Sequence, residues 1–293
     1  MDKRAYGNAG LAVSILGLGA GQVGAAALDE AGASRLLNSA LDLGINLIDT
    51  ARGYGLSEAR IGRHLAHRRS EFVLATKVGY GIEGQLDWTA SCVTAGIDEA
   101  LRLLCTEYID IVHLHSCELP TLLAGEVVDA LDRARALGKI GLVAYSGEND
   151  ALAWSVASGR FGGIECSVNL FDQGSLGGAL ALAAGHGLGV IAKRPLGNAP
   201  WRLAQRPAGD YCEIYWHRMH QLAYDTAGLP WDELALRFSA FQPGVSVAIV
   251  GTASVEHLRH NVRLAQKGPL PTPMVDTLRA RFAALGGAWP GEV

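Results

Sequence analysis

The sequence predicts an α/β protein, specifically a closed (β/α)8 TIM barrel. Eight short apolar segments alternate with segments of helical length along the 293 residues. The apolar segments are nearly continuous, which is typical of parallel strands that are buried on both faces. Eight such units favour a closed barrel over an open sheet. No Gly-x-Gly-x-x-Gly motif opens a helix after the first strand, because Gly17, Gly19 and Gly21 are spaced differently.

Each expected element follows from its apolar pattern and from the turn residues around it. The expected strands are 14–18, 45–48, 72–77, 109–115, 140–146, 163–169, 189–193 and 245–250. Helical patterns lie between them, at 33–43, 89–104, 122–137, 151–159, 176–184, 231–241 and 255–266, and a further one covers 275–285. Residues 3–13, with a Gly7-Asn8-Ala9-Gly10 turn, fit a hairpin across the barrel floor. The long stretch 197–221 is expected to be irregular and to cover the mouth.

Length and composition fit one barrel domain over residues 1–293. Hydrophobic residues make up 49 %, enough for a large core, and 25 basic against 29 acidic residues give a net charge of −4. This balance argues against nucleic acid or an anionic membrane as the main partner. There is no apolar signal segment or membrane span, and the five cysteines include no Cys-x-x-Cys pair. A cytoplasmic protein is expected, and the oligomeric state stays open.

Polar side chains close three consecutive expected strands. Asp49 follows the second strand, Lys77 ends the third and His115 ends the fourth, while Tyr54 lies five residues after Asp49. Each has a structural alternative, such as a cap, a packed loop aromatic, a solvated strand end or a satisfied interior histidine. Carboxyl ends of barrel strands meet at one face, where active sites form. The four together therefore predict a site for proton transfer.

The chemistry explains why these residue types belong together. A tyrosine hydroxyl titrates near ~10, so it is a weak acid toward a developing alkoxide. An adjacent ammonium stabilises the phenolate, and Lys77 is placed to do this with Asp49 holding its charge. His115 would orient a carbonyl oxygen and share its developing negative charge. No side chain donates hydride, so a nicotinamide cofactor is expected to supply it.

Five motifs carry a resemblance to the aldo-keto reductase family over nearly the whole chain. They are NLIDTARGYGLSEARIG, ATK, IDIVHLHS, GKIGLVAYS and SVAIVGTASVEHLRHNV, in the family's order. The resemblance implies an NADPH-dependent carbonyl reductase with a barrel fold. It also implies a catalytic tetrad, which corresponds to Asp49, Tyr54, Lys77 and His115. The positions that it implies for cofactor binding are Gly19, Ala20, Gly21, Asp49, Ser146, Glu165, Lys193, Arg194, Pro195, Leu196, Gly197, Gly251, Thr252, Ser254, His257, His260 and Asn261.

Several of these positions depart from the family pattern. A Ser-Asn pair after the fifth strand reads Ser146-Gly147, and a carboxamide-binding glutamine reads Glu165, which accepts but does not donate a hydrogen bond. The aromatic residue that stacks on nicotinamide reads Lys193. At the 2′-phosphate site the basic positions read Gly251 and His257. The resemblance favours NADP(H) over NAD(H), with discrimination weakened by these changes.

Two other functions and the substrate remain open from the sequence. His113-x-His115 resembles the paired histidines of metal-dependent barrel hydrolases, although the later strand ends supply no convincing further ligands. A cofactor-binding regulatory or sensor subunit with slow turnover is the stronger alternative. A small carbonyl or alcohol substrate is expected in an open mouth without a long C-terminal flap. Candidate wall residues are Tyr80, Trp88, Leu119, Trp201, Tyr211 and Trp216.

Overall fold

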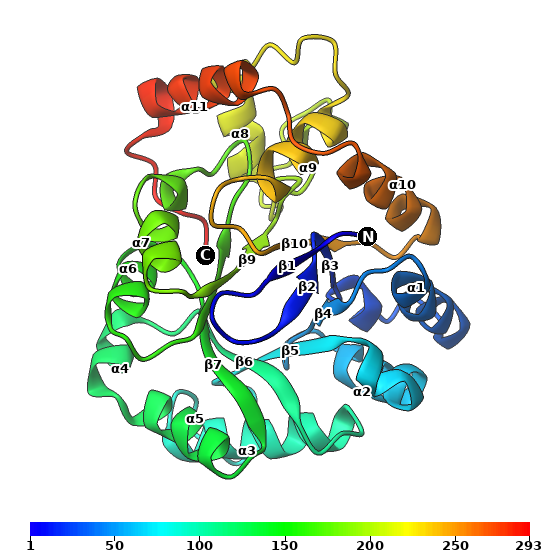
Figure 1. Cartoon of the computed structure of the whole chain (residues 1–293), viewed down its shortest axis with the longest axis vertical. Coiled ribbons are helices and arrows are strands. Elements are labelled where there is room, and N and C mark those ends of the chain that lie inside the picture. The colour runs from blue at the N-terminus through cyan, green and yellow to red at the C-terminus, as the bar shows by residue number, and fades with distance from the viewer.

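A computed structural model describes all residues, 1–293, and contains a closed barrel of eight parallel strands (Figure 1). The strands follow one another around the barrel in chain order, and the last pairs with the first. The predicted fold class is therefore confirmed. The barrel strands are β3 (Leu16–Gly19), β4 (Leu47–Asp49), β5 (Val73–Val78), β6 (Ile109–His115), β7 (Ile140–Ser146), β8 (Gly163–Ser167), β9 (Gly189–Lys193) and β10 (Val247–Gly251).

Helices surround the barrel, as the alternating pattern predicts (Figure 1). The predicted helix at 122–137 is two helices, because Gly125 adopts a left-handed conformation (φ 85°) that interrupts it. The helices are α1 (Glu30–Asp42), α2 (Ser57–Leu65), α3 (Ala90–Leu103), α4 (Leu119–Ala124), α5 (Glu126–Ala136), α6 (Asn149–Ala157), α7 (Ala179–Gly185), α8 (Glu213–Leu222), α9 (Trp231–Ala240), α10 (Val255–Gln266) and α11 (Thr272–Gly286). None is long and apolar enough to cross a membrane.

The N-terminal hairpin closes the floor of the barrel, as expected. Its strands β1 (Lys3–Ala5) and β2 (Ala12–Ser14) pair antiparallel. Tyr6 is fully buried, and its ring lies so close to Gly163 and Gly189 that a side-chain carbon at either glycine would overlap it. These glycines begin two barrel strands, so the tyrosine seals the end opposite the strand carboxyl ends.

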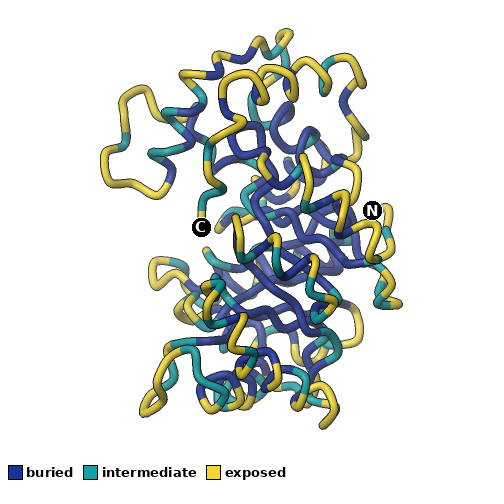
Figure 2. Tube along the Cα trace, turned by 90° about the vertical axis from the view of Figure 1, so that its left-hand side faces the viewer, coloured by how far each residue is buried: buried dark blue, intermediate teal, exposed yellow.

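The main hydrophobic core fills the layer between strands and helices, and a smaller core lies inside the barrel. In Figure 2 the buried trace runs through the barrel, while exposed segments cover the periphery. The inner core includes Leu47, Ala75, Ile111 and Ile191, one from each of four strands. Apolar residues thus fill the lower barrel, and the polar residues gather above them at the mouth.

The stretch 197–221 contains more structure than expected. It forms a 3₁₀ turn at Pro200–Arg202 and then helix α8, which packs beside α11. Tyr215 of α8 is buried in a second hydrophobic core together with Phe238 of α9. The expectation of an irregular stretch is wrong for α8, because Tyr215 and Leu222 of this segment are buried in the second core beside α11 and so stabilise a helix.

Candidate active site

The carboxylate and the ammonium predicted from the sequence form a buried ion pair. Asp49 ends β4, Lys77 lies in β5, and Lys77 Nζ is 2.5 Å from Asp49 Oδ2. Both side chains are at most 1 % exposed. Lys77 Nζ also donates to the Thr50 carbonyl at 3.2 Å. Because two adjacent strands hold the pair, its position is fixed by the barrel itself.

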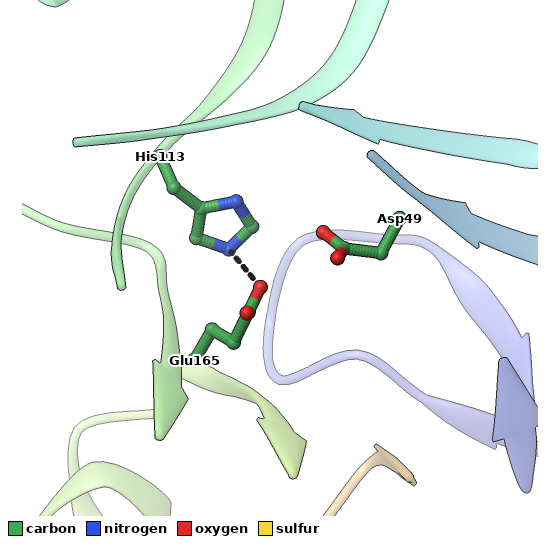
Figure 3. A group of neighbouring side chains, drawn as sticks. All are labelled: Asp49, His113 and Glu165. Carbon is green, nitrogen blue, oxygen red and sulfur yellow. Dashed lines mark ion pairs between the residues drawn. The ribbon is translucent and has the colours of Figure 1, made fainter. Parts of the chain in front are cut away.

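A second carboxylate, Glu165 from β8, shares this ammonium across the barrel. Its Oε2 atom lies 3.2 Å from Lys77 Nζ and 4.0 Å from His113 Nε2. Figure 3 shows Asp49, His113 and Glu165 converging from three strands. Their ligand atoms lie within 4.8 Å of one another. The Lys77 ammonium contacts both carboxylates, so two acidic groups share one positive charge.

The three charged groups shift one another's protonation. Burial opposes the charge of Lys77, but Asp49 and Glu165 outweigh it and raise the pKa of the lysine. Burial, and then the charge of Glu165, raise the pKa of Asp49 well above its usual range. Burial also opposes the charge of Glu165, but Lys77, followed by His113, outweighs it and lowers the pKa of the glutamate. One ammonium thus faces two carboxyls, of which Asp49 is the harder to ionise.

Tyr54 lies over this ion pair, in the turn that precedes α2. Lys77 Nζ is 5.3 Å from the centre of its ring. Lys77 lowers the pKa of Tyr54 more than any other single influence, as expected. Burial and the carboxylates of Asp49 and Glu165 together exceed that effect, and the pKa rises to about 12. The net shift is therefore opposite to the expected one, because the expectation included neither the burial of the phenol nor the Glu165 carboxylate beside the lysine.

Close contacts fix the turn that carries Tyr54. A side-chain carbon at Gly24 would lie 1.6 Å from the Tyr54 carbonyl oxygen, so the two backbones touch. The Ser57 hydroxyl accepts from Thr50 at 2.8 Å and donates to the Ala20 carbonyl at 2.9 Å. These contacts join the loop after β3 to the turn that carries Tyr54.

His115 faces the phenol of Tyr54 from the end of β6. The two ring centres lie 5.9 Å apart in an edge arrangement. Burial, and then the charge of Lys77, lower the pKa of His115 to about 3, so its imidazole is neutral near pH 7. Its Nδ1 atom is 2.8 Å from the Tyr80 hydroxyl, which leaves Nε2 for the cavity. His113 lies deeper, is fully buried and has a pKa lowered by burial to about 4.

A cavity of about 1150 Å³ joins these residues to the loops of the strand ends. Tyr54, His115 and Asp49 line it, whereas Lys77 is covered by them. Most predicted cofactor positions line it too: Gly19, Gly21, Asp49, Ser146, Glu165, Lys193, Arg194, Pro195, Leu196, Gly251, Thr252, His257, His260 and Asn261. Ala20, Gly197 and Ser254 do not contribute to the lining. Of the suggested wall residues, Trp201 and Tyr211 line the cavity, and Tyr80, Trp88, Leu119 and Trp216 do not.

One end of the cavity is built as a cradle for an anion. The first turn of α10 begins there, and Ser254 caps it by accepting from the backbone N–H of His257. The remaining N–H groups of such a turn and the helix dipole favour negative charge. Gly21 lines the cavity, and a side-chain carbon there would meet no protein atom within 4 Å. These features fit the phosphates of a dinucleotide.

The mouth also contains contacts that the sequence did not indicate. Arg194 donates to the Glu292 carbonyl at 2.6 Å, and Asp172 accepts from the Glu292 N–H at 2.9 Å. The C-terminal residues therefore reach the mouth, and Val293 lines the cavity. Asp232, at the start of α9, lines the cavity and pairs with His260 at 2.7 Å. In the sequence, the only sign of Asp232 as a site residue is that it follows Pro230-Trp231, where a helix begins.

Known proteins are similar to this chain in sequence and in fold. Residues 15–281 match the Aldo/keto reductase family profile. L-galactose dehydrogenase of Arabidopsis thaliana is 30% identical, over 89% of this chain and 87% of its own. A probable voltage-gated potassium channel subunit beta of Oryza sativa subsp. japonica is 29% identical, over 96% of both chains. An aldo-keto reductase of Bacillus halodurans, solved in its holo form, superposes with a TM-score of 0.83 at 26% identity, over 98% of this chain and 97% of its own. The chain therefore belongs to the aldo/keto reductase family.

Proposed function

We propose that this protein is an NAD(P)H-dependent oxidoreductase that interconverts an aldehyde or ketone with its alcohol. The observation that carries the proposal is the placement of Tyr54 and His115 on one cavity, above the buried Lys77–Asp49 pair. A binding module has no need of a tyrosine positioned over a buried ammonium. We infer carbonyl reduction as the working reaction class, in the cytoplasm, where five free cysteines are stable.

In reduction, Tyr54 is the general acid. With a pKa of about 12 its hydroxyl stays protonated at neutral pH, ready to protonate the carbonyl oxygen as negative charge develops there. Lys77 stabilises the phenolate that remains, and Asp49 holds the lysine in place. His115 is neutral, so its Nε2 hydrogen orients the carbonyl oxygen and shares its charge. In oxidation the same tyrosine accepts the hydroxyl proton.

A nicotinamide dinucleotide, when bound, supplies or accepts the hydride that no side chain offers. Gly19 and Ser146 line the cavity beside the strand ends that carry Asp49 and His115. Gly21 and the α10 cradle, with Gly251 and Thr252, would hold the phosphates. We propose NADP(H) as the cofactor, on the family resemblance. His257, His260 and Asn261, the residues of α10 that line the cavity, include no lysine or arginine, so discrimination against NAD(H) is expected to be weak.

The alternative is a regulatory subunit that holds the cofactor and turns over slowly. Some relatives are described as channel beta subunits, and Lys193 stands where an aromatic residue would stack on nicotinamide. A panel of aldehydes and ketones, assayed with NADPH and NADH, separates the two functions by turnover. Cofactor binding without turnover of any carbonyl or alcohol would favour the regulatory function.

The test of the mechanism is Tyr54→Phe, which keeps the ring and removes the proton. Reduction is expected to fall by about 10²–10⁴-fold, the usual effect of a lost general acid. Cofactor affinity, measured by calorimetric titration, is expected to stay the same. Near-normal turnover of this variant would show that another group supplies the proton.

A further inference from the structure

We propose that Glu165 makes this site bind the oxidised, positively charged nicotinamide in preference to the reduced, neutral one. Glu165 is a specificity-determining residue in this proposal, which rests on the function proposed above. The starting observation is that its carboxylate is 2 % exposed, lines the cavity and shares its one contacting ammonium, Lys77, with Asp49. A buried charge that shares its counter-ion is costly unless something else positive faces it.

Counting the charged groups around Glu165 gives an excess of one negative charge. Lys77 is in contact with Asp49 and Glu165, at 2.5 and 3.2 Å. Lys193, which ends β9, has its own carboxylate, Glu148, at 3.3 Å. Two ammonium groups thus face three carboxylates.

The other groups near Glu165 do not balance it by direct contact. His113 and His115 are neutral near pH 7, since burial lowers the pKa of each. The guanidinium of Arg194 keeps its charge, but it lies against the Glu292 carbonyl and the Tyr211 ring and makes no ion pair with Glu165. Burial raises the pKa of Asp49 and of Glu148, so either a proton on one of these carboxyls or a bound cation balances the extra negative charge.

The reaction brings a cation to this place. A carbonyl carbon whose oxygen contacts Tyr54 and His115 must lie about 3–3.5 Å from the atom that exchanges hydride with it. A bound nicotinamide ring would therefore lie in the part of the cavity beside these two residues. Glu165 lines the same cavity, and its carboxylate contacts the ammonium beneath Tyr54.

The two redox states of the nicotinamide ring differ mainly in charge and only slightly in shape. The oxidised ring carries one positive charge and the reduced ring none, while both keep the same carboxamide, riboses and phosphates. A neutral hydrogen bond from residue 165 would affect both states alike. Only the charge of Glu165 favours one over the other, so the ratio of the two dissociation constants isolates it.

The experiment measures Kd for NADP⁺ and NADPH, and for NAD⁺ and NADH, by isothermal titration calorimetry at pH 8. In Glu165→Gln, binding of the oxidised cofactor is expected to weaken about tenfold relative to binding of the reduced cofactor. This is the Coulomb effect of one charge across roughly 10 Å of protein. Glu58→Gln is the matched control. Glu58 is a buried carboxylate bonded to Thr76 that does not line the cavity, and this variant is expected to leave the ratio unchanged.

A second variant tests the same charge balance in the opposite direction. Lys193→Met removes a cation, so it is expected to strengthen binding of the oxidised form relative to the reduced form. It also keeps the test decisive if Glu165→Gln does not fold. If Glu165→Gln folds and its ratio of oxidised to reduced Kd equals that of the wild type, the inference is overturned. If only Lys193→Met folds, an unchanged ratio in that variant overturns it. If the wild-type protein binds none of the four dinucleotides, it is the proposed function that fails.

Discussion

The hydroxyl of Tyr80 lies 2.8 Å from Nδ1 of His115, and the two rings stack with their centres 5.5 Å apart. The tyrosine comes from the loop after β5 and the histidine from the end of β6. A neutral imidazole has one N–H group, so the hydrogen bond at Nδ1 decides which nitrogen offers a hydrogen to the cavity. When the phenol donates to Nδ1, Nε2 carries the hydrogen that orients a carbonyl oxygen.

Removing that hydroxyl is expected to weaken catalysis without removing the ring. Tyr80→Phe keeps the stacking on His115 but allows the other tautomer, so kcat/KM should fall about tenfold, the scale of one net hydrogen bond. Cofactor Kd should not change. Tyr108→Phe is the control, because Tyr108 is an exposed tyrosine away from the cavity. Equal kcat/KM in Tyr80→Phe and the wild type would show that Tyr80 does not set the tautomer.

Lys77 and Asp49 are expected to act as one unit. Lys77→Met removes the largest influence that lowers the pKa of Tyr54, so this pKa should rise further above about 12. Oxidation, which needs the phenolate, would then require still higher pH, whereas reduction loses the stabilised phenolate product. Adding Asp49→Asn to this variant should lower the reaction rate by much less than the product of the two single effects predicts. Rate–pH profiles of both single variants and the double variant measure this, and fully multiplicative losses would contradict it.

Gly24 is expected to be essential for the position of Tyr54. In Gly24→Ala the new methyl group would overlap the Tyr54 carbonyl oxygen, so the turn that carries Tyr54 must move. Overpacking of this kind costs about 1–3 kcal/mol of folding free energy, and turnover should fall more than cofactor affinity. Gly174→Ala is the control, since a side-chain carbon there meets nothing within 4 Å. A fully active Gly24→Ala enzyme would mean that the turn adjusts without moving the phenol.

The sequence predicts the barrel well because strand and helix periods are local properties. Strands β6, β7 and β9 begin and end where their apolar runs do. Asp49, Lys77 and His115 come together because parallel strands share one carboxyl end, a rule that needs no coordinates. The helix break at Gly125 was missed, because an isolated glycine inside a helical pattern is often tolerated.

Contacts between distant segments could not be predicted in the same way. The sequence places Glu165 at a changed carboxamide position, yet across the barrel it contacts Lys77. Burial, Asp49 and Glu165 together raise the pKa of Tyr54. The contact of Arg194 with Glu292 joins residues 98 positions apart, for which no periodic signal exists. Electrostatic balance depends on such distances, so it becomes visible only in the folded chain.

The α10 cradle is expected to hold the cofactor phosphate through His257. His257 lines the cavity in the first turn of α10, where the resemblance implies a basic residue, and Asp232 with His260 adds a carboxylate nearby. A histidine attracts a phosphate only when protonated, so NADPH should bind more tightly at pH 6 than at pH 8, while NADH should change little. His257→Arg should tighten NADPH binding by roughly 1–3 kcal/mol and remove most of this pH dependence.

Fluorescence titration of both cofactors across pH 6 to 8 makes the comparison. His67→Arg adds the same charge at an exposed histidine that does not line the cavity, and it is expected to change neither affinity. Arg259 is bonded to Glu256 on the exposed side of α10, and neither it nor Arg263 lines the cavity. If the wild-type protein nevertheless prefers NADPH strongly and equally at every pH, one of these arginines must turn toward the phosphate when the cofactor binds, and His257 does not hold it.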